Sequence, residues 1–318
     1  MKLRIGSRGS QLALWQANHI AALLRGQGHE VEIEIIKTTG DRLQEVTFAQ
    51  VGSKGMFTKE IEEALAEGRV DLAVHSLKDL PTELPEPFTL AATPPRVDPR
   101  DAFVSVKYGN LAALPIGARV GTSSQRRRAQ LKALRPDVEA IEFRGNVDTR
   151  LRKLAEGQVD AILLASAGLD RLGKTEWVRE RLEPKDFCPA AGQGALGIET
   201  HKGDEATIAA VAFLDEPATR FAVTAERAAL AAMGGGCQVP IGVYCRVRVD
   251  EPGDSGSEPV DEIFGVVAAP ETGAAVRIFH RAPRGASDPA ALGRLAARML
   301  FEAGAGPLLE GVPDGDSR

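Results

Sequence analysis

Three hydroxyl residues and three arginines follow one another where a short predicted strand leads into a predicted helix. The stretch 122–128 reads TSSQRRR. The first N–H groups of a helix lack partners within the helix and carry partial positive charge, so such a junction binds anions. One hydroxyl would be enough to cap the helix, but a run of three followed by arginines favours an anion site at 122–127. Successive helical residues point about 100° apart, and we expect Arg128 to face solvent or a salt bridge.

Further basic residues stand at similar junctions. Arg144 and Arg150 flank a second strand-to-helix turn, Lys54 lies in a glycine-flanked loop before a helix, and Arg8 follows the first predicted strand. Each alone could be an ordinary solvated turn. Open α/β sheets, however, bind ligands at the edge where strands end and helices begin. Together these positions predict a cationic cleft between two domains, suited to a ligand with several carboxylates or phosphates.

One carboxylate stands among these cations. A predicted buried strand, 70–74, leads into HSLKDLP at 75–81, where Lys78 and Asp79 could be ordinary loop charges. In a cationic cleft, Asp79 would stay ionised and could stabilise a developing cation or accept its proton. His75 and Ser76 are adjacent in a strand, so their side chains point to opposite faces and a nucleophilic Ser–His pair is disfavoured.

Cys237 follows three glycines at the end of a predicted helix. A buried structural thiol is the default for a free cysteine. The glycines leave Cys237 open to approach, and a helix C-terminus does not acidify a thiol, so the context favours covalent attachment of a group over a strongly activated nucleophile. Cys188 and Cys245 are expected to be structural. The three cysteines show no metal-ligand spacing, so no metal is predicted.

The stretch 192–197 matches the G-x-G-x-x-G pattern of dinucleotide sites. No clear strand precedes it and no helix follows, although a dinucleotide site needs both. We interpret 189–194 as a hinge between domains.

Composition excludes several classes of protein. The 318 residues are 43% hydrophobic and 26% charged, which indicates a globular chain of two or three domains. The net charge of −5 argues against a general nucleic-acid binder, and no apolar run approaches the roughly 20 residues of a membrane helix. Three cysteines without a pairing pattern fit a reducing compartment. Because the N-terminus enters a predicted strand at once, leaving no room for a signal peptide, we expect a cytoplasmic protein.

The elements that position these residues alternate along the first 200 residues. Apolar, β-branched runs predict strands at 31–36, 70–74, 119–121, 138–141 and 159–163. Helical periodicity predicts helices at 12–24, 58–66, 125–134 and 147–155. This alternation predicts α/β domains with largely parallel sheets.

A weak internal repeat supports two such domains. The residues Arg4–Arg8 resemble Arg119–Ser123, and Glu67–Asp71 resemble Glu156–Asp160. We expect a first domain at 1–96 with 195–214 and a second at 97–194. A third, α+β domain is expected at 215–318, with helices at 217–233 and 289–302, strands at 241–249, 263–268 and 275–280, a mobile hairpin loop at 250–262 and a frayed tail at 311–318.

In their order along the chain, the motifs resemble those of the porphobilinogen deaminases, also called hydroxymethylbilane synthases. The motifs are Ile5–Gln16, His75–Pro81, Gly121–Arg127, Arg144–Val147, Ala190–Gly194 and Gly236–Gly242. Residues after Gly242 match only in general pattern, and Gly9 and the 250–262 loop depart from the family. The resemblance implies an α/β fold of two domains like those of type II periplasmic binding proteins, with a small third α+β domain that carries the cofactor.

The resemblance also implies an activity. Four porphobilinogen molecules would be deaminated and joined head to tail into the linear tetrapyrrole hydroxymethylbilane, with release of ammonia, in heme- or chlorophyll-type biosynthesis. A dipyrromethane cofactor, derived from two porphobilinogen units, would be held by a thioether to Cys237. Asp79 would be the catalytic residue, which holds pyrrole N–H groups and stabilises the azafulvene cation left by ammonia. A monomer that binds neither nucleic acid nor membrane is expected.

Each porphobilinogen carries an acetate and a propionate, so cationic and hydroxyl side chains suit the growing chain. By resemblance, the cofactor-binding residues are Cys237, Lys78, Ser76, Asp79, Thr122, Ser123, Ser124, Arg126, Arg127, Arg144 and Gly145. The substrate-binding residues are Arg8, Ser10, Lys54, Phe57, Arg144, Arg150 and Gln193.

The competing hypothesis is a non-catalytic anion-binding protein of the two-domain, solute-receptor kind. The cleft and the hinge would permit it, but no export signal supports it, and Cys237 and the third domain would have no role. A nucleic-acid binder with a basic patch is disfavoured by the acidic net charge and by the lack of interleaved aromatic residues.

Overall fold

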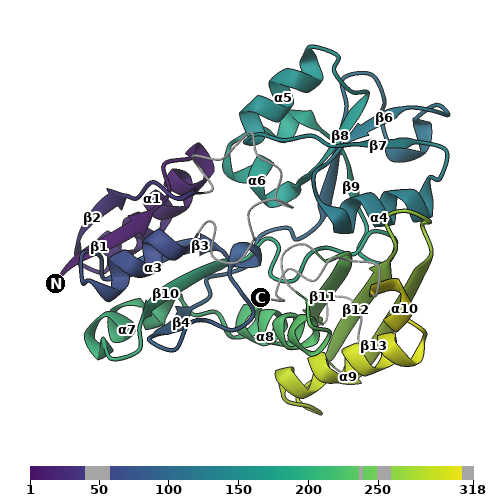
Figure 1. Ribbon diagram of the computed structural model, residues 1–318. Helices are drawn as coiled ribbons and strands as arrows, with labels where there is room; N and C mark the ends of the chain where they lie inside the picture. Colours follow the sequence, from purple (N-terminus) through teal and green to yellow (C-terminus); the bar gives the residue numbers. More distant parts are fainter. Residues whose placement is uncertain (40–57, 236–238, 249–258, 310–318) are drawn as a thin grey trace.

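The computed structural model describes residues 1–39, 58–235, 239–248 and 259–309, which form three sheets. Figure 1 shows each sheet in a lobe of its own, the first at the left, the second at the upper right and the third at the lower right. Three predicted site residues, Lys54, Phe57 and Cys237, lie outside the described residues, as does the predicted tail at 311–318.

The first sheet has the strand order β2-β1-β3-β10-β4, in which β10 runs antiparallel to its two neighbours. Its strands are β1 (Lys2–Ser7), β2 (Glu30–Ile35), β3 (Leu72–Ser76), β4 (Phe88–Ala92) and β10 (Leu196–His201). Helix α1 (Gln11–Gly26) buries Ala17, Ile20 and Leu24, at helical spacing, against one face. Helix α3 (Lys59–Ala66) packs Ile61 and Leu65 in a separate core cluster with residues of β3 and β4, and helix α7 (Glu205–Val211) follows β10.

The second sheet has the order β7-β6-β8-β5-β9, in which β5 is antiparallel to its neighbours. Its strands are β5 (Asp101–Val104), β6 (Arg119–Gly121), β7 (Glu139–Ile141), β8 (Ala161–Ala165) and β9 (Val178–Leu182). Helix α4 (Gln125–Leu134) and helix α5 (Val147–Ala155) contribute Leu131 and Leu151 to two different core clusters of this sheet, and α6 (Ser166–Arg171) follows β8.

The two sheets have the same arrangement, which confirms the internal repeat. The Asp71 Oδ2 atom accepts a hydrogen bond from the Arg4 backbone N–H at 2.7 Å, and Asp160 Oδ2 accepts one from the Arg119 N–H at 2.8 Å. Both aspartates stand just before the central strand of their sheet. Two mixed sheets of this order, flanked by helices, make the chain an α/β protein with two similar units.

The third sheet is antiparallel throughout, with the order β11-β12-β13. Its strands are β11 (Ile241–Arg248), β12 (Val260–Ala268) and β13 (Ala275–Pro283). Helix α8 (Pro217–Ala232) and helix α9 (Pro289–Glu302) share one core with this sheet, and α10 (Gly306–Leu309) follows. A Cβ atom on Gly293 would lie 2.1 Å from the Ala225 carbonyl, so α8 and α9 meet at their backbones. The predicted end of the loop at residue 262 is wrong, because residues 260–262 pair with β11 as part of strand β12.

Most predicted elements lie within two residues of their observed bounds. Two predicted strands begin too early, because 70–71 and 159–160 form the turn that precedes each strand. The Asp71 and Asp160 N–H groups donate to the Arg4 and Arg119 carbonyls there. Short 3-10 turns occupy Leu77–Asp79, Leu111–Ala113, Thr175–Trp177 and Ala212–Leu214.

Two segments, 93–100 and 187–195, connect the first two sheets and run side by side. The Val97 N–H donates to the Gly194 carbonyl at 3.3 Å. Gly194 has a φ of +89°, and a Cβ there would lie 2.6 Å from the Val97 carbonyl oxygen, so this contact requires glycine. The G-x-G-x-x-G stretch therefore belongs to a crossing that continues into strand β10 without the helix that a dinucleotide site needs.

A buried ion pair attaches both crossings to the third sheet. Arg96, on the first crossing, donates to the two carboxylate oxygens of Glu226 on α8 at 2.6 and 3.1 Å. Glu226, which is fully buried, also accepts from the N–H groups of Gly192 at 2.6 Å and Cys245 at 2.8 Å. One side chain of α8 thus holds the second crossing, the first crossing and strand β11.

Candidate active site

The 3-10 turn after β3 presents Lys78 and Asp79. Leu77 and Leu80 are buried against Ala195 and Val223, which fixes the backbone on either side of the two charges. The Asp79 side chain is exposed and Lys78 is half-buried. Strand β3 and the buried Leu77 and Leu80 thereby position a carboxylate and an ammonium group at the carboxyl end of a parallel strand, where α/β sheets bind ligands.

Asp79 lines a cavity together with three other residues predicted for the site. The cavity is bounded by Arg8, Ser10, Ser76 and Asp79, among others. The Ser10 hydroxyl accepts from the Ala13 N–H at 3.3 Å and caps helix α1. These residues come from the ends of β1 and β3, as the sequence predicts.

His75 and Ser76 have separate partners. The Ser76 hydroxyl accepts a hydrogen bond from the Gln16 side chain at 2.9 Å. The His75 Nε2 atom lies 3.0 Å from Glu199 Oε2 on strand β10, and both side chains are buried. The disfavoured Ser–His pair does not form.

The three hydroxyl groups before α4 have two kinds of partner: two accept from backbone N–H groups and one accepts from an arginine. The Ser124 hydroxyl caps the helix by accepting from the Arg127 N–H, and the Thr122 hydroxyl accepts from the Ser124 N–H at 3.2 Å. The Ser123 hydroxyl instead accepts from Arg150 Nη2 at 3.3 Å. Capping therefore accounts for two of the three hydroxyls, and only Ser123 reaches a cation of the site.

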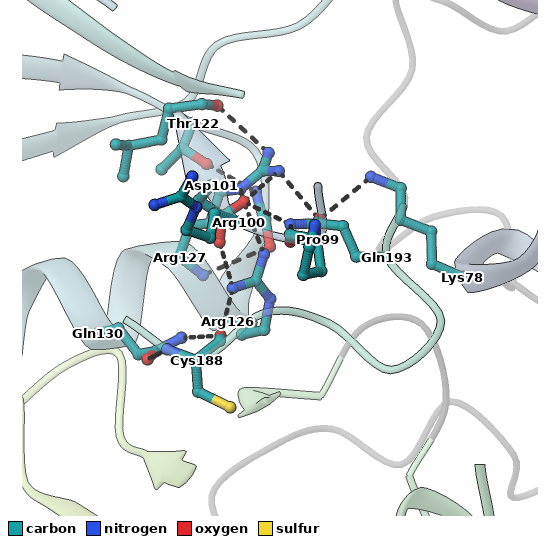
Figure 2. Close-up of polar contacts among 12 residues, drawn as sticks. Lys78, Pro99, Arg100, Asp101, Thr122, Arg126, Arg127, Gln130, Cys188 and Gln193 are labelled. Carbon is teal, nitrogen blue, oxygen red and sulfur yellow. Dashed lines mark hydrogen bonds and ion pairs between the residues drawn. The ribbon is translucent and has the colours of Figure 1, made fainter. Parts of the chain in front are cut away.

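Arg126 and Arg127 are buried and share one carboxylate, that of Asp101 (Figure 2). Asp101 Oδ2 accepts from Arg126 Nη1 at 2.7 Å, and Oδ1 accepts from Arg127 Nε at 2.8 Å. Burial opposes ionisation of Asp101, but the two guanidinium groups hold its pKa far below the usual range. Arg128 points elsewhere and pairs with Glu142 at 3.3 Å, in agreement with its predicted orientation.

Arg144, Gly145 and Arg150 lie at the second strand-to-helix junction. Arg144 Nε donates to Glu142 at 2.7 Å, and Gly145 has a φ of +124° that favours glycine. The Nε atom of Arg150 is buried and has no hydrogen-bond partner among the described residues. Burial, and then the positive charges of Arg127 and Arg144, lower the pKa of Arg150 to about 10. An anion bound here would accept a hydrogen bond from the Nε atom and would stabilise the charged guanidinium group of Arg150.

Cations from the first two lobes meet at Gln193, which lies on the second crossing (Figure 2). Its Oε1 atom accepts from Lys78 Nζ at 3.5 Å and from Arg127 Nη2 at 3.4 Å. Burial lowers the pKa of Lys78 to about 8, with Asp79 opposing and Arg127 adding to that shift. A carboxylate near Lys78 would raise that pKa again and stabilise the ammonium group, so this region too favours an anionic ligand.

The structure thus groups the predicted site residues in three ways. One network contains Lys78, Arg126, Arg127 and Gln193, and a separate hydrogen bond joins Ser123 to Arg150. One cavity is lined by Arg8, Ser10, Ser76 and Asp79. Two buried carboxylates, Asp101 in this network and Glu226 in the ion pair with Arg96, were missed from the sequence. Asp101 directly follows the crossing 93–100 and resembles a loop charge in the sequence, while Glu226 lies in a helix.

The described cysteines and acidic residues show no other chemistry. Burial raises the pKa of Cys188 to about 12 and also raises that of Cys245, so both thiols are structural, as predicted. Across the described ranges, no group of His, Cys, Asp and Glu side chains could hold a metal ion. No helix in those ranges is long and apolar enough to cross a membrane.

Family models match almost all of the chain. The model "Porphobilinogen deaminase, dipyromethane cofactor binding domain" matches residues 3–209. The model "Porphobilinogen deaminase, C-terminal domain" matches residues 220–302.

Curated relatives match over nearly their whole length. A porphobilinogen deaminase of Roseiflexus castenholzii is 50% identical over 97% of this chain and 99% of its own. One of Nitratidesulfovibrio vulgaris is 49% identical over 98% of this chain and 97% of its own. Among solved structures, the methionine binding protein MetQ aligns with a TM-score of 0.45 and 12% identity over 67% of this chain and 89% of its own.

Proposed function

Because the chain belongs to the porphobilinogen deaminase family, we propose that the cations described above bind the carboxylates of its dipyrromethane cofactor and of porphobilinogen. The protein is a transferase, a hydroxymethylbilane synthase that deaminates four porphobilinogen molecules and joins them into a linear tetrapyrrole. It works with a dipyrromethane cofactor. The observation that carries the proposal for the site is the meeting of Lys78 and Arg127, from different lobes, beside the exposed carboxylate of Asp79.

The residues present fit an anionic cofactor. Arg126 and Arg127 share the single charge of Asp101, so the pair keeps a net positive charge, and Lys78 adds to it. The buried Nε of Arg150 has no partner in the described part of the chain. We assign Lys78, Arg126, Arg127, Arg150 and Ser123 to ligand carboxylates, while Cys237 would hold the cofactor through a thioether. When bound, the cofactor supplies the anchored pyrrole whose free carbon is extended.

Asp79 is assigned the acid–base and electrostatic work. Its carboxylate would accept hydrogen bonds from pyrrole N–H groups. It would also stabilise the positive charge that forms on the substrate when the aminomethyl group leaves as ammonia. A proton is lost when the new carbon–carbon bond forms, and Asp79 would take it and return it to solvent. Arg8 and Ser10, which line the same cavity, would hold the carboxylates of the incoming porphobilinogen.

The domain boundaries follow the sheets in this proposal. The first domain is 1–96 with 195–214, the second is 97–194 and the third is 215–318. The pair of crossings that meets at Gly194 would act as the hinge as the chain lengthens. We further propose that the protein is a monomer and that it is cytoplasmic. Its three cysteines without a pairing pattern fit a reducing compartment.

Ammonia release with matched arginine variants tests this assignment. The native protein is expected to release four ammonia molecules per tetrapyrrole. Arg150→Met should lower kcat/KM about tenfold or more, because a charge-assisted hydrogen bond contributes about 1.5–3 kcal/mol. Arg152→Met, on the same helix but with its side chain 63% exposed, should leave kcat/KM unchanged. Equal effects of the two variants would contradict the role of Arg150, and binding of a polycarboxylate without ammonia release would instead favour the solute-receptor hypothesis.

A further inference from the structure

We propose that Asp101 is a positioning residue for the reaction, which holds Arg126 and Arg127 in the orientation that their ligand contacts require. This inference rests on the proposed role of the two arginines in binding carboxylates. Asp101 itself is fully buried and would touch neither cofactor nor substrate. It would act through the guanidinium groups that it fixes.

Asp101 and two backbone carbonyls occupy several donors of both arginines. Arg126 Nη1 donates to Asp101 Oδ2 at 2.7 Å and to the Cys188 carbonyl at 2.7 Å, and its Nη2 donates to Asp101 Oδ1 at 3.2 Å. Arg127 donates to Asp101 through Nε at 2.8 Å and to the Leu163 carbonyl through Nη1 at 3.2 Å. A guanidinium group is planar and has five N–H donors, so fixing several of them sets the direction of the rest.

The charge balance of the cluster requires an ionised carboxylate at this place. Arg126 and Arg127 are each more than nine-tenths buried, and burial lowers the pKa of Arg127. They hold the pKa of Asp101 so low that it remains ionised at any working pH. Without its charge, two buried cations would stand side by side and would separate or take up other contacts. The carboxylate therefore determines the position of the guanidinium groups as well as their charge.

Asp101 also connects the arginines to the crossings between the lobes. It is the first residue of β5, directly after the crossing 93–100. Gln193, on the other crossing, donates through Nε2 to Asp101 Oδ1 at 3.0 Å and to the Pro99 carbonyl at 2.7 Å. Figure 2 shows Asp101 between Gln193 and the two arginines. A shift of one crossing against the other would therefore move the carboxylate that holds both arginines.

Two substitutions at Asp101 separate positioning from folding. Asp101→Asn keeps the shape of the side chain and removes its charge, whereas Asp101→Glu keeps the charge and displaces the carboxylate by one methylene. Glu262→Gln is the matched control, because Glu262 is also a buried carboxylate held by two arginines, at 2.6 Å from Arg246 Nε and 3.0 Å from Arg281 Nε, but in the third sheet. Apo forms of each variant are incubated with porphobilinogen, and cofactor loading is followed by intact mass beside kcat and KM.

Both Asp101 variants are expected to load the cofactor and to turn over about 10- to 100-fold more slowly, since a displacement of about 1 Å can cost a factor of 100. The Glu262→Gln variant should load and turn over at the native rate. Native rates in a folded Asp101→Asn variant would overturn the inference. If that variant does not fold, native rates in Asp101→Glu would overturn it equally. Arg126→Gln and Arg127→Gln variants that load normally would instead contradict the proposed function.

Discussion

Asp79→Asn is expected to reduce the turnover of porphobilinogen at least about 100-fold, within the range that general acid–base and electrostatic groups contribute. Asparagine preserves the size of the side chain, but its amide can neither carry the negative charge nor take a proton. Because the Asp79 side chain is exposed and its turn is fixed by Leu77 and Leu80, the fold should not change.

Turnover of this variant should be measured at saturating porphobilinogen and divided by the fraction of protein that carries the cofactor, as determined by intact mass. Asp137→Asn serves as the control, since Asp137 forms a partly exposed pair with Arg135 on the second lobe. The control should retain native turnover. Near-native turnover in Asp79→Asn would remove Asp79 from the role proposed here.

The largest effect on stability is expected from Glu226→Gln, with a loss of about 3–5 kcal/mol in the free energy of unfolding. The substitution leaves Arg96, which is nine-tenths buried, without its counter-charge. It also weakens the hydrogen bonds from the Gly192 and Cys245 N–H groups, which attach the second crossing and strand β11 to α8. The damage therefore reaches all three lobes.

Urea unfolding of the full chain measures this loss. Glu32→Gln is the control, because the Lys2–Glu32 pair is about half exposed and such pairs contribute about 0–1 kcal/mol. A double variant, Arg96→Met with Glu226→Met, should lose less stability than the sum of the losses of the two single variants. Each single variant leaves one buried charge without its partner, whereas the double variant leaves none. A loss near that of the control would show that the buried pair is not what joins the lobes.

Local signals in the sequence predicted the elements that carry the arginines. Helices α4 and α5 have their predicted bounds because each has a capping side chain, Ser124 or Asn146, directly before it. The antiparallel insertion of β5 and β10 could not be predicted, because it depends on pairings between distant segments such as Leu196 with Ser76. The repeat became clear only when both sheets showed the same order.

The candidate site, too, could be predicted from the sequence only in part. Residues at strand ends, such as Lys78 and Asp79, were predicted because a strand end fixes a position in the sheet. The sequence could not show that Arg126 and Arg127 share Asp101, since a carboxylate 25 residues away along the chain can be recognised as a partner only in three dimensions. Burial, which turns these ordinary charges into a network, is likewise a property of the folded chain.

The central claim is that this chain works through a dipyrromethane group attached to Cys237, and intact mass under denaturing conditions tests it most directly. The freshly purified protein should exceed its chain mass by two porphobilinogen units less two ammonia, and a Cys237→Ser variant should show the chain mass alone. A protein without added mass should be incubated with porphobilinogen and weighed again, which separates an apo preparation from a chain that takes up no cofactor. An unchanged mass after incubation, or a covalent pyrrole on the Cys237→Ser variant, would contradict the account.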